Sequence, residues 1–133
     1  SSENGKHITL DKLNKAIRKH IHDKDVISDN GEEIWNVLQQ TGIKNVVLVG
    51  VHTNMCVLGR PFGLRQMAKN GMNVVLCRDL TDTMYNPKMK PFVSHFTGTD
   101  LIVEHIEKWV CPTIERSNWK KQFVREHIMA YGI

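Results

Sequence analysis

Cys56 stands where an apolar strand gives way to a helix, and a cysteine in that position is well placed to act as a nucleophile. The β-branched run 46–49 stops at Gly50, a short polar turn follows, and Cys56 then opens the next expected helix. Ligands of open α/β sheets bind at the carboxyl ends of the strands. The free N–H groups and partial positive charge of a helix amino terminus favour thiolate over thiol. We therefore predict that Cys56 is a reactive thiolate.

Four further side chains are candidates to contact a substrate near this thiol. His52 lies in the turn itself, either as a substrate contact and proton carrier or as a residue of which only the backbone matters. Asn54 belongs to the same turn, where a turn or capping role is the alternative. Asp79 follows the next apolar run, and either orients site groups or caps the loop after it. His95 is expected to face the site from a long loop.

The other two cysteines lie in apolar surroundings and indicate no chemistry. Cys77 belongs to an apolar run and Cys111 precedes Pro112, so we expect both to be inert core residues. Three cysteines cannot all pair, and no C-x-x-C spacing occurs. Free thiols indicate a reduced compartment, and we expect a cytoplasmic protein.

Length and composition exclude several classes of protein. The 133 residues suffice for one domain, which we take as 1–133, with 115–133 as a basic C-terminal tail or helix. No apolar run is long enough to span a bilayer. The net charge of +4 is mild, and the densest basic stretch, 116–125, carries no nucleic-acid motif. We expect a small-molecule substrate as partner, and neither nucleic acid nor a membrane.

Alternating helix and strand signals predict an α/β fold with a mostly parallel sheet. Pro61 and Gly63 predict a break near 59–60 in the helix that carries Cys56. Gly42 is expected to end the helix before the first strand. The expected elements are a helix capped by Thr9, a second helix after a turn at 28–31, strand 43–49, helix 54–70, strand 73–77, loop 80–97, a helix opened by Thr99 that buries Trp109, edge strand 110–114 and a helix over 117–133.

The motif 50–57, Gly-Val-His-Thr-Asn-Met-Cys-Val, resembles the nucleophile motif of the isochorismatase-like cysteine hydrolases, which include nicotinamidases and N-carbamoylsarcosine amidases. The likeness continues through 71–79, which looks like the next strand of that superfamily and its terminal Asp, and plausibly runs from Asp25 to Ile114. The resemblance implies a three-layer α/β/α Rossmann-like sandwich. It also implies hydrolysis of a small amide-like or related substrate through a covalent acyl-enzyme on Cys56.

The family's catalytic residues carry over only in part. Of its Cys-Asp-Lys triad, Cys56 matches, and Lys24 has the spacing to Ser28 that the family lysine shows, with a surface lysine as the alternative. A cis peptide bond of the family falls at Val51–His52, where the N–H groups of His52 and Cys56 would form an oxyanion hole. The nicotinamidase metal ligands have no counterpart, so we expect no metal and no other cofactor.

The family's acidic residue comes from a first strand about a hundred residues before the cysteine, and only 55 residues precede Cys56 here. The sheet is therefore expected to be N-terminally incomplete. Three explanations stay open: a fragment, a strand supplied by another subunit, or a relative that has lost catalysis. A bare sheet edge predicts self-association into a homo-oligomer. Besides a hydrolase, a non-catalytic binding or oligomerisation module and a redox-sensing thiol protein remain as hypotheses.

Overall fold

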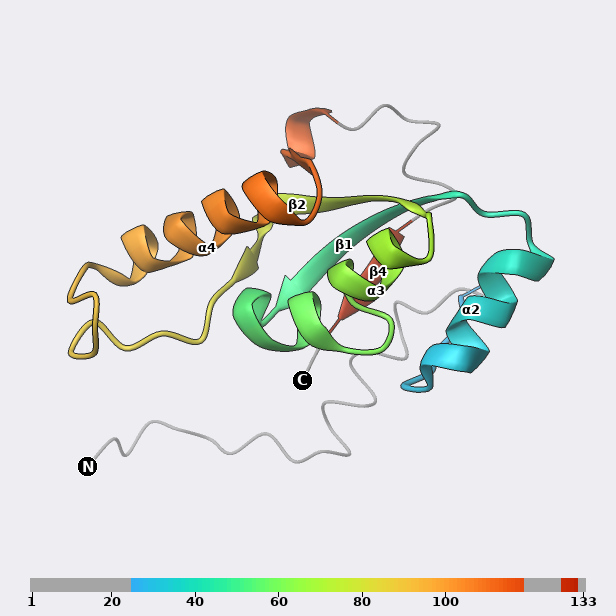
Figure 1. The fold of residues 1–133 in the computed structure, drawn as a ribbon, viewed down its shortest axis with the longest axis horizontal. Helices are drawn as coiled ribbons and strands as arrows, with labels where there is room; N and C mark the ends of the chain where they lie inside the picture. Colours follow the sequence, from blue (N-terminus) through green and yellow to red (C-terminus); the bar gives the residue numbers. More distant parts are fainter. Residues whose placement is uncertain (1–24, 119–127, 132–133) are drawn as a thin grey trace.

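A computed structural model describes residues 25–118 and 128–131, and Figure 1 shows an α/β fold built on a four-stranded sheet. All strand pairs are parallel and the strand order is β3-β2-β1-β4. The strands are β1 Asn45–Val51, β2 Asn73–Asp82, β3 Thr113–Ile114 and β4 Ile128–Tyr131. The helices are α2 Gly31–Gln40, the π-helical turn η1 Thr53–Val57, α3 Leu64–Lys69, α4 His95–Trp109 and the 3₁₀ turn η2 Arg116–Asn118. The predicted α/β class and parallel sheet are confirmed.

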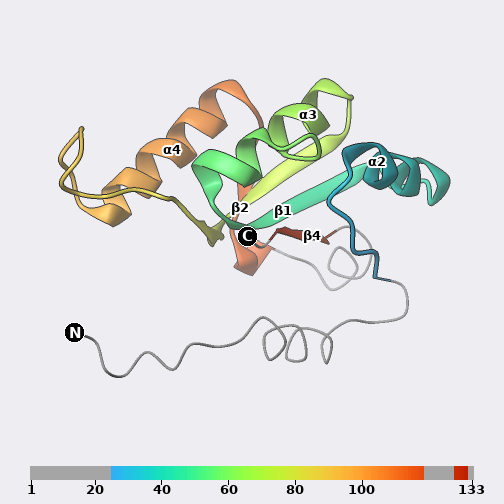
Figure 2. The same ribbon diagram turned by 90° about the horizontal axis from the view of Figure 1, so that it is seen from below.

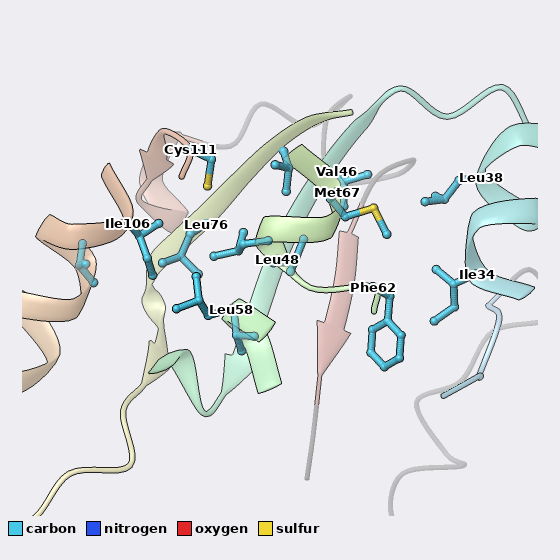
Figure 3. Close-up of a cluster of buried hydrophobic side chains, with 14 residues drawn as sticks. Ile34, Leu38, Val46, Leu48, Leu58, Phe62, Met67, Leu76, Ile106 and Cys111 are labelled. Atoms are coloured by element: carbon cyan, nitrogen blue, oxygen red, sulfur yellow. The ribbon is translucent and has the colours of Figure 1, made fainter. Parts of the chain in front are cut away.

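The helices α2, α3 and α4 lie on one face of the sheet, as Figure 2 shows from below. Figure 3 shows how the core forms there, with Ile34 and Leu38 of α2 near Met67, and Ile106 of α4 over Leu76. Apolar side chains at helical spacing on α2 and α4 thus meet alternate residues of the strands. The buried cluster comprises Ile34, Leu38, Val46, Leu48, Val57, Leu58, Phe62, Leu64, Met67, Val74, Leu76, Val103, Ile106 and Cys111. Among the described residues, the α-helices all lie on this face.

The two central strands end together at the carboxyl edge of the sheet. Their register runs from Asn45 opposite Asn73 to Leu48 opposite Leu76, and an irregularity then shifts it so that Gly50 lies opposite Thr81. The irregularity adds residues to β2 that have no partner in β1. After it the pairing resumes, and Val51 lies opposite Asp82 at the end of β2. The turn that carries Cys56 therefore begins directly beside the end of β2.

The strand β4 pairs with β1 on the side away from β2, and it comes from a segment for which the sequence predicted a helix. Residues 128–131 form β4, with Gly50 of β1 opposite Tyr131, so the helix expected over 117–133 is wrong at this segment. Because β4 pairs with β1, the edge on which the prediction of self-association rested is covered, and self-association stays a prediction without that support. The remainder of that stretch, and the helix expected after Thr9, lie outside the described residues.

Helix α2 begins and ends as the sequence predicted. The side chain of Asn30 accepts a hydrogen bond of 3.0 Å from the backbone N–H of Glu33, which caps the amino terminus. Gly42 adopts a φ of 69°, a conformation that glycine adopts without strain, just after the helix ends.

Several boundaries differ from the prediction: β1 is Asn45–Val51 rather than 43–49, and β3 is Thr113–Ile114 rather than 110–114. β2 extends to Asp82 rather than ending at Cys77, and α4 begins at His95, capped by Ser94, rather than at Thr99. The loop between them is therefore 83–94 instead of 80–97. Trp109, expected to pack, leaves 71% of its surface exposed at the end of α4. No helix among the described residues is both long enough and apolar enough to cross a bilayer.

The predicted break in the helix after Cys56 is confirmed, and Gly63 explains why it lies where it does. A Cβ on Gly63 would lie 2.7 Å from the carbonyl oxygen of Val57, whereas a Cβ on Gly59 would meet nothing within 4 Å. We expect Gly63→Ala to lower the free energy of unfolding by about 1–3 kcal/mol, because backbone must move to admit the methyl group. Gly59→Ala is the matched control and should stay within about 1 kcal/mol of wild type. Urea denaturation of both variants measures this, and equal stabilities would contradict the close approach at Gly63.

Candidate active site

Cys56 lies in η1, the turn that follows β1, and its side chain is partly exposed. The Val51–His52 peptide bond before it is cis, as the resemblance implied. The carbonyl of His52 accepts hydrogen bonds from the N–H groups of Met55, at 3.0 Å, and Val57, at 3.2 Å. Because Val57 is fully buried, the turn is fixed to the core while Cys56 itself stays partly exposed.

The other two thiols are held in their neutral form. Cys77 is fully buried, and burial together with a hydrogen bond to Asp79 raises its pKa to about 12. Cys111 is also buried, and desolvation raises its pKa to about 11. The prediction that both lie in the core is confirmed, their lack of reactivity stays a prediction, and Cys56 differs from them in its exposure.

Asn54 fastens the cysteine turn to the chain that follows β2. Its side-chain amide donates to the carbonyl of Met84 at 3.1 Å, and its carbonyl oxygen accepts from the N–H of Met84 at 2.9 Å. This paired contact engages both polar ends of the Asn54 side chain. The Asn54 side chain thus joins the turn to a distant segment rather than capping it, and its role as a substrate contact stays a prediction.

A second connection lies beside the first. The hydroxyl groups of Thr53 and Thr81 lie 2.5 Å apart, and Thr81 donates to the carbonyl of Gly50 at 2.7 Å. Thr53 is fully buried, so its hydroxyl requires this partner. The connection ties the start of η1 to the end of β2.

His95 forms an ion pair with Asp82 at the same edge. Its Nε2 lies 2.8 Å from a carboxylate oxygen of Asp82, and its Nδ1 lies 3.0 Å from the carbonyl oxygen of Tyr85. The hydrogen bond to Asp82 raises the pKa of His95, with further help from the Tyr85 carbonyl. The same hydrogen bond lowers the pKa of Asp82. The pair thus stays charged over a wider pH range than either group alone.

Asp79 is engaged on the opposite side of β2 from the cysteine turn. One carboxylate oxygen accepts from the thiol of Cys77 at 3.1 Å and from the backbone N–H of Arg116 at 2.8 Å. The hydrogen bond from Cys77 is the largest cause that lowers the pKa of Asp79. Its contacts lie with η2, next to β3, and its role as a substrate contact stays a prediction.

The remaining candidates are placed as follows. Val51 lies opposite Asp82 in the sheet, and His52 is partly exposed between Val51 and η1. Lys24 lies outside the described residues. Within the described ranges, no three His, Cys, Asp or Glu side chains come together as a metal site would require.

Two open hollows lie away from the cysteine turn. One, of about 390 Å³, lies between α2 and the stretch 61–70 and includes Trp35 and Glu32. The other, of about 320 Å³, lies between α3 and α4 and includes His105 and Trp109. Neither has Cys56 in its lining.

Asp82, Thr81 and Met84 were missed from the sequence. Each contributes through a contact with a residue 13 to 30 positions away: Asp82 with His95, Thr81 with Thr53 and Met84 with Asn54. The available signal was the polar, β-branched continuation Thr81-Asp82-Thr83, which permits a strand beyond Cys77.

A parallel sheet with its cysteine turn at the carboxyl edge of a central strand defines a Rossmann-like α/β protein. Residues 7–102 match the family model described as the isochorismatase domain. This match covers most of the chain, so the protein belongs to the isochorismatase family, whose members are generally hydrolases. Comparisons with curated proteins and with solved structures found no match.

Proposed function

We propose that this protein is a cysteine hydrolase that cleaves a small amide-like or related substrate through Cys56. The carrying observation is the contrast between thiols. Cys56 is partly exposed at the carboxyl edge of the sheet, whereas Cys77 and Cys111 are buried with raised pKa values. Family membership supports hydrolysis, and the nucleophile turn supports the thiol as its agent.

In the proposed reaction the Cys56 thiolate attacks the substrate carbonyl carbon and forms a C–S bond. The carbonyl oxygen takes the negative charge, which the N–H groups of His52 and Cys56 are proposed to stabilise. The C–N bond then breaks, and the leaving nitrogen takes a proton and departs as an amine or ammonia. Water hydrolyses the thioester, which releases the acid and restores the thiolate. Lys24 is proposed to keep the thiolate ionised.

Selective alkylation tests the activation of Cys56. We expect iodoacetamide at pH 6.5 to modify Cys56 at least about tenfold faster than Cys77 or Cys111, because reaction requires an accessible thiolate. Peptide mass spectrometry over a time course measures the three rates separately. A urea-unfolded sample is the control, in which the three rates should converge. Equal rates in the folded protein would overturn the proposal.

A non-catalytic binding module is the second candidate, and one observation favours it. The two carboxylates on β2 are engaged away from Cys56, Asp79 with the thiol of Cys77 and Asp82 with His95. p-Nitrophenyl acetate separates the two candidates. A hydrolase forms an acetyl-Cys56 intermediate, whereas a binding module with an ordinary thiol gives no burst of p-nitrophenolate.

A further inference from the structure

We propose that His95 is a positioning residue of the cysteine turn, which it reaches through Asp82, the carbonyl of Tyr85 and Asn54. The inference rests on the proposed role of Cys56, and it adds a control of that site through a residue outside the turn. It concerns the segment 81–85, the end of β2 and the first residues after it.

Every residue of the segment 81–85 has a polar partner in the cysteine turn or in α4, and Thr81 and Tyr85 have further partners in β1 and in the loop. Thr81 and Met84 bind the cysteine turn, through Thr53 and Asn54 respectively. The remaining three bind the first two turns of α4: Asp82 and the Tyr85 carbonyl contact His95, and the Thr83 hydroxyl lies 2.7 Å from that of Thr99. The segment therefore connects α4 to the turn that carries Cys56.

The two partners of His95 determine its protonation state. A carboxylate and a carbonyl oxygen only accept hydrogen bonds, so His95 satisfies both only when both ring nitrogens carry a proton. A neutral ring would lose one of the two contacts. His95 therefore holds Asp82 and Tyr85 together as an imidazolium, and deprotonation releases one of them.

Met84 lies between the two residues that His95 holds. Asp82 and Tyr85 flank it closely along the chain, and its own N–H and carbonyl are the groups that Asn54 binds. A shift of the segment on one side therefore displaces the partner of Asn54. α4 also packs on η1 directly. Loss of the His95 contacts therefore affects the cysteine turn both through Asn54 and through this packing.

The pH range of this control follows from the charged groups around the ring. From β2, Asp82 faces His95. From the loop, the carbonyl of Tyr85 faces it, and from α4 the ring of Phe96 lies edge-on at 6.0 Å. Asp82 raises the pKa of His95 above its ordinary value of 6.5. Both hydrogen bonds of the ring are therefore present below pH 6.5, and one of them is lost as pH rises through the raised pKa. On the acid side they persist until Asp82 protonates below its ordinary value.

Amide NMR spectra of the full chain between pH 5 and 9 test the connection without reference to catalysis. We expect the backbone signals of Met84 and Cys56 to titrate with the His95 ring. In Asn54→Ala, Met84 should still titrate with His95, while the step at Cys56 should become smaller, because only the Thr53–Thr81 contact and the packing of α4 on η1 remain to carry it. In His95→Gln, which keeps an N–H near Asp82 but does not titrate, neither signal should show that step. His105→Gln, a change at an exposed histidine on the same helix, should leave both titrations unchanged.

Acetylation by p-nitrophenyl acetate tests the effect on chemistry. We expect His95→Ala to acetylate Cys56 about tenfold more slowly, His95→Gln to recover part of that loss, and His105→Ala to stay within about twofold of wild type. The inference is overturned if the Cys56 amide signal does not change as His95 titrates. It is also overturned if His95→Ala and wild type acetylate Cys56 at equal rates. Coupled NMR titrations without any acetylation would instead overturn the proposed hydrolase and leave the connection standing.

Discussion

Replacing Cys56 by alanine is expected to abolish acyl transfer by this protein and to leave its fold unchanged. The variant lacks the atom that forms the thioester, so the initial burst of p-nitrophenolate from p-nitrophenyl acetate should disappear. Loss of a catalytic nucleophile typically costs on the order of 10⁴-fold or more. Because Cys56 is partly exposed and its sulfur forms no hydrogen bond within the described residues, the free energy of unfolding should change by less than about 0.5 kcal/mol.

Cys111→Ala is the matched control for this experiment. It removes a buried thiol whose pKa is raised to about 11, so the burst should persist even where the variant is less stable. Rapid-mix absorbance at fixed enzyme concentration measures the burst, and intact mass identifies the acetyl group. A burst of wild-type size in Cys56→Ala would place the nucleophile elsewhere and refute the proposed function.

The central part of the fold and the cysteine turn were predictable because their signals are local. The apolar run that ends at Gly50 and the break signalled by Pro61 and Gly63 depend on neighbours within a few residues. β2 follows β1 through one helical segment. Two apolar strands joined in this way usually pair in parallel through a right-handed crossover. The burial of Cys77 likewise followed from its own apolar run.

The contacts around the site were not predictable, because they join residues that are distant in sequence. The extension of β2 to Asp82 depends on the Thr53 hydroxyl, and the hydrogen bonds of Met84 depend on Asn54, both about thirty residues earlier. β4 pairs with β1, about eighty residues away in the sequence, whereas the spacing of Trp119, Phe123 and Ile128 indicated a helix. Trp109 is a large aromatic residue of the kind that usually packs in a core, but it lies largely exposed at the end of α4.

These differences share one physical cause. Local sequence pattern predicts a strand or helix that shows its own apolar face. A polar strand end such as 79–82 has no such pattern, and it is stable only when partners from elsewhere satisfy its side chains and backbone. The same kind of partner, Asp82 and the Tyr85 carbonyl, raises the pKa of His95. A candidate site built from such contacts is therefore visible only once the strands have been placed beside one another.

Leu48→Ala is expected to cause the largest loss of stability of any variant proposed, about 3–5 kcal/mol in the free energy of unfolding. Leu48 is fully buried in the central strand, with Leu76 of β2 on one side and Met129 of β4 on the other in the register. Removing three carbons there loses their transfer free energy and leaves a cavity that paired strands on both sides cannot collapse. Urea denaturation followed by far-UV circular dichroism measures the change in midpoint.

Leu101→Ala provides the same chemical change on the surface of α4. Leu101 is 43% exposed, and alanine favours a helix, so this variant should stay within about 1 kcal/mol of wild type. The difference between the two leucine variants thus isolates the packing of β1 beneath the cysteine turn. Equal losses, or a loss below about 1.5 kcal/mol for Leu48→Ala, would show that β1 is not the buried central strand on which the placement of Cys56 depends.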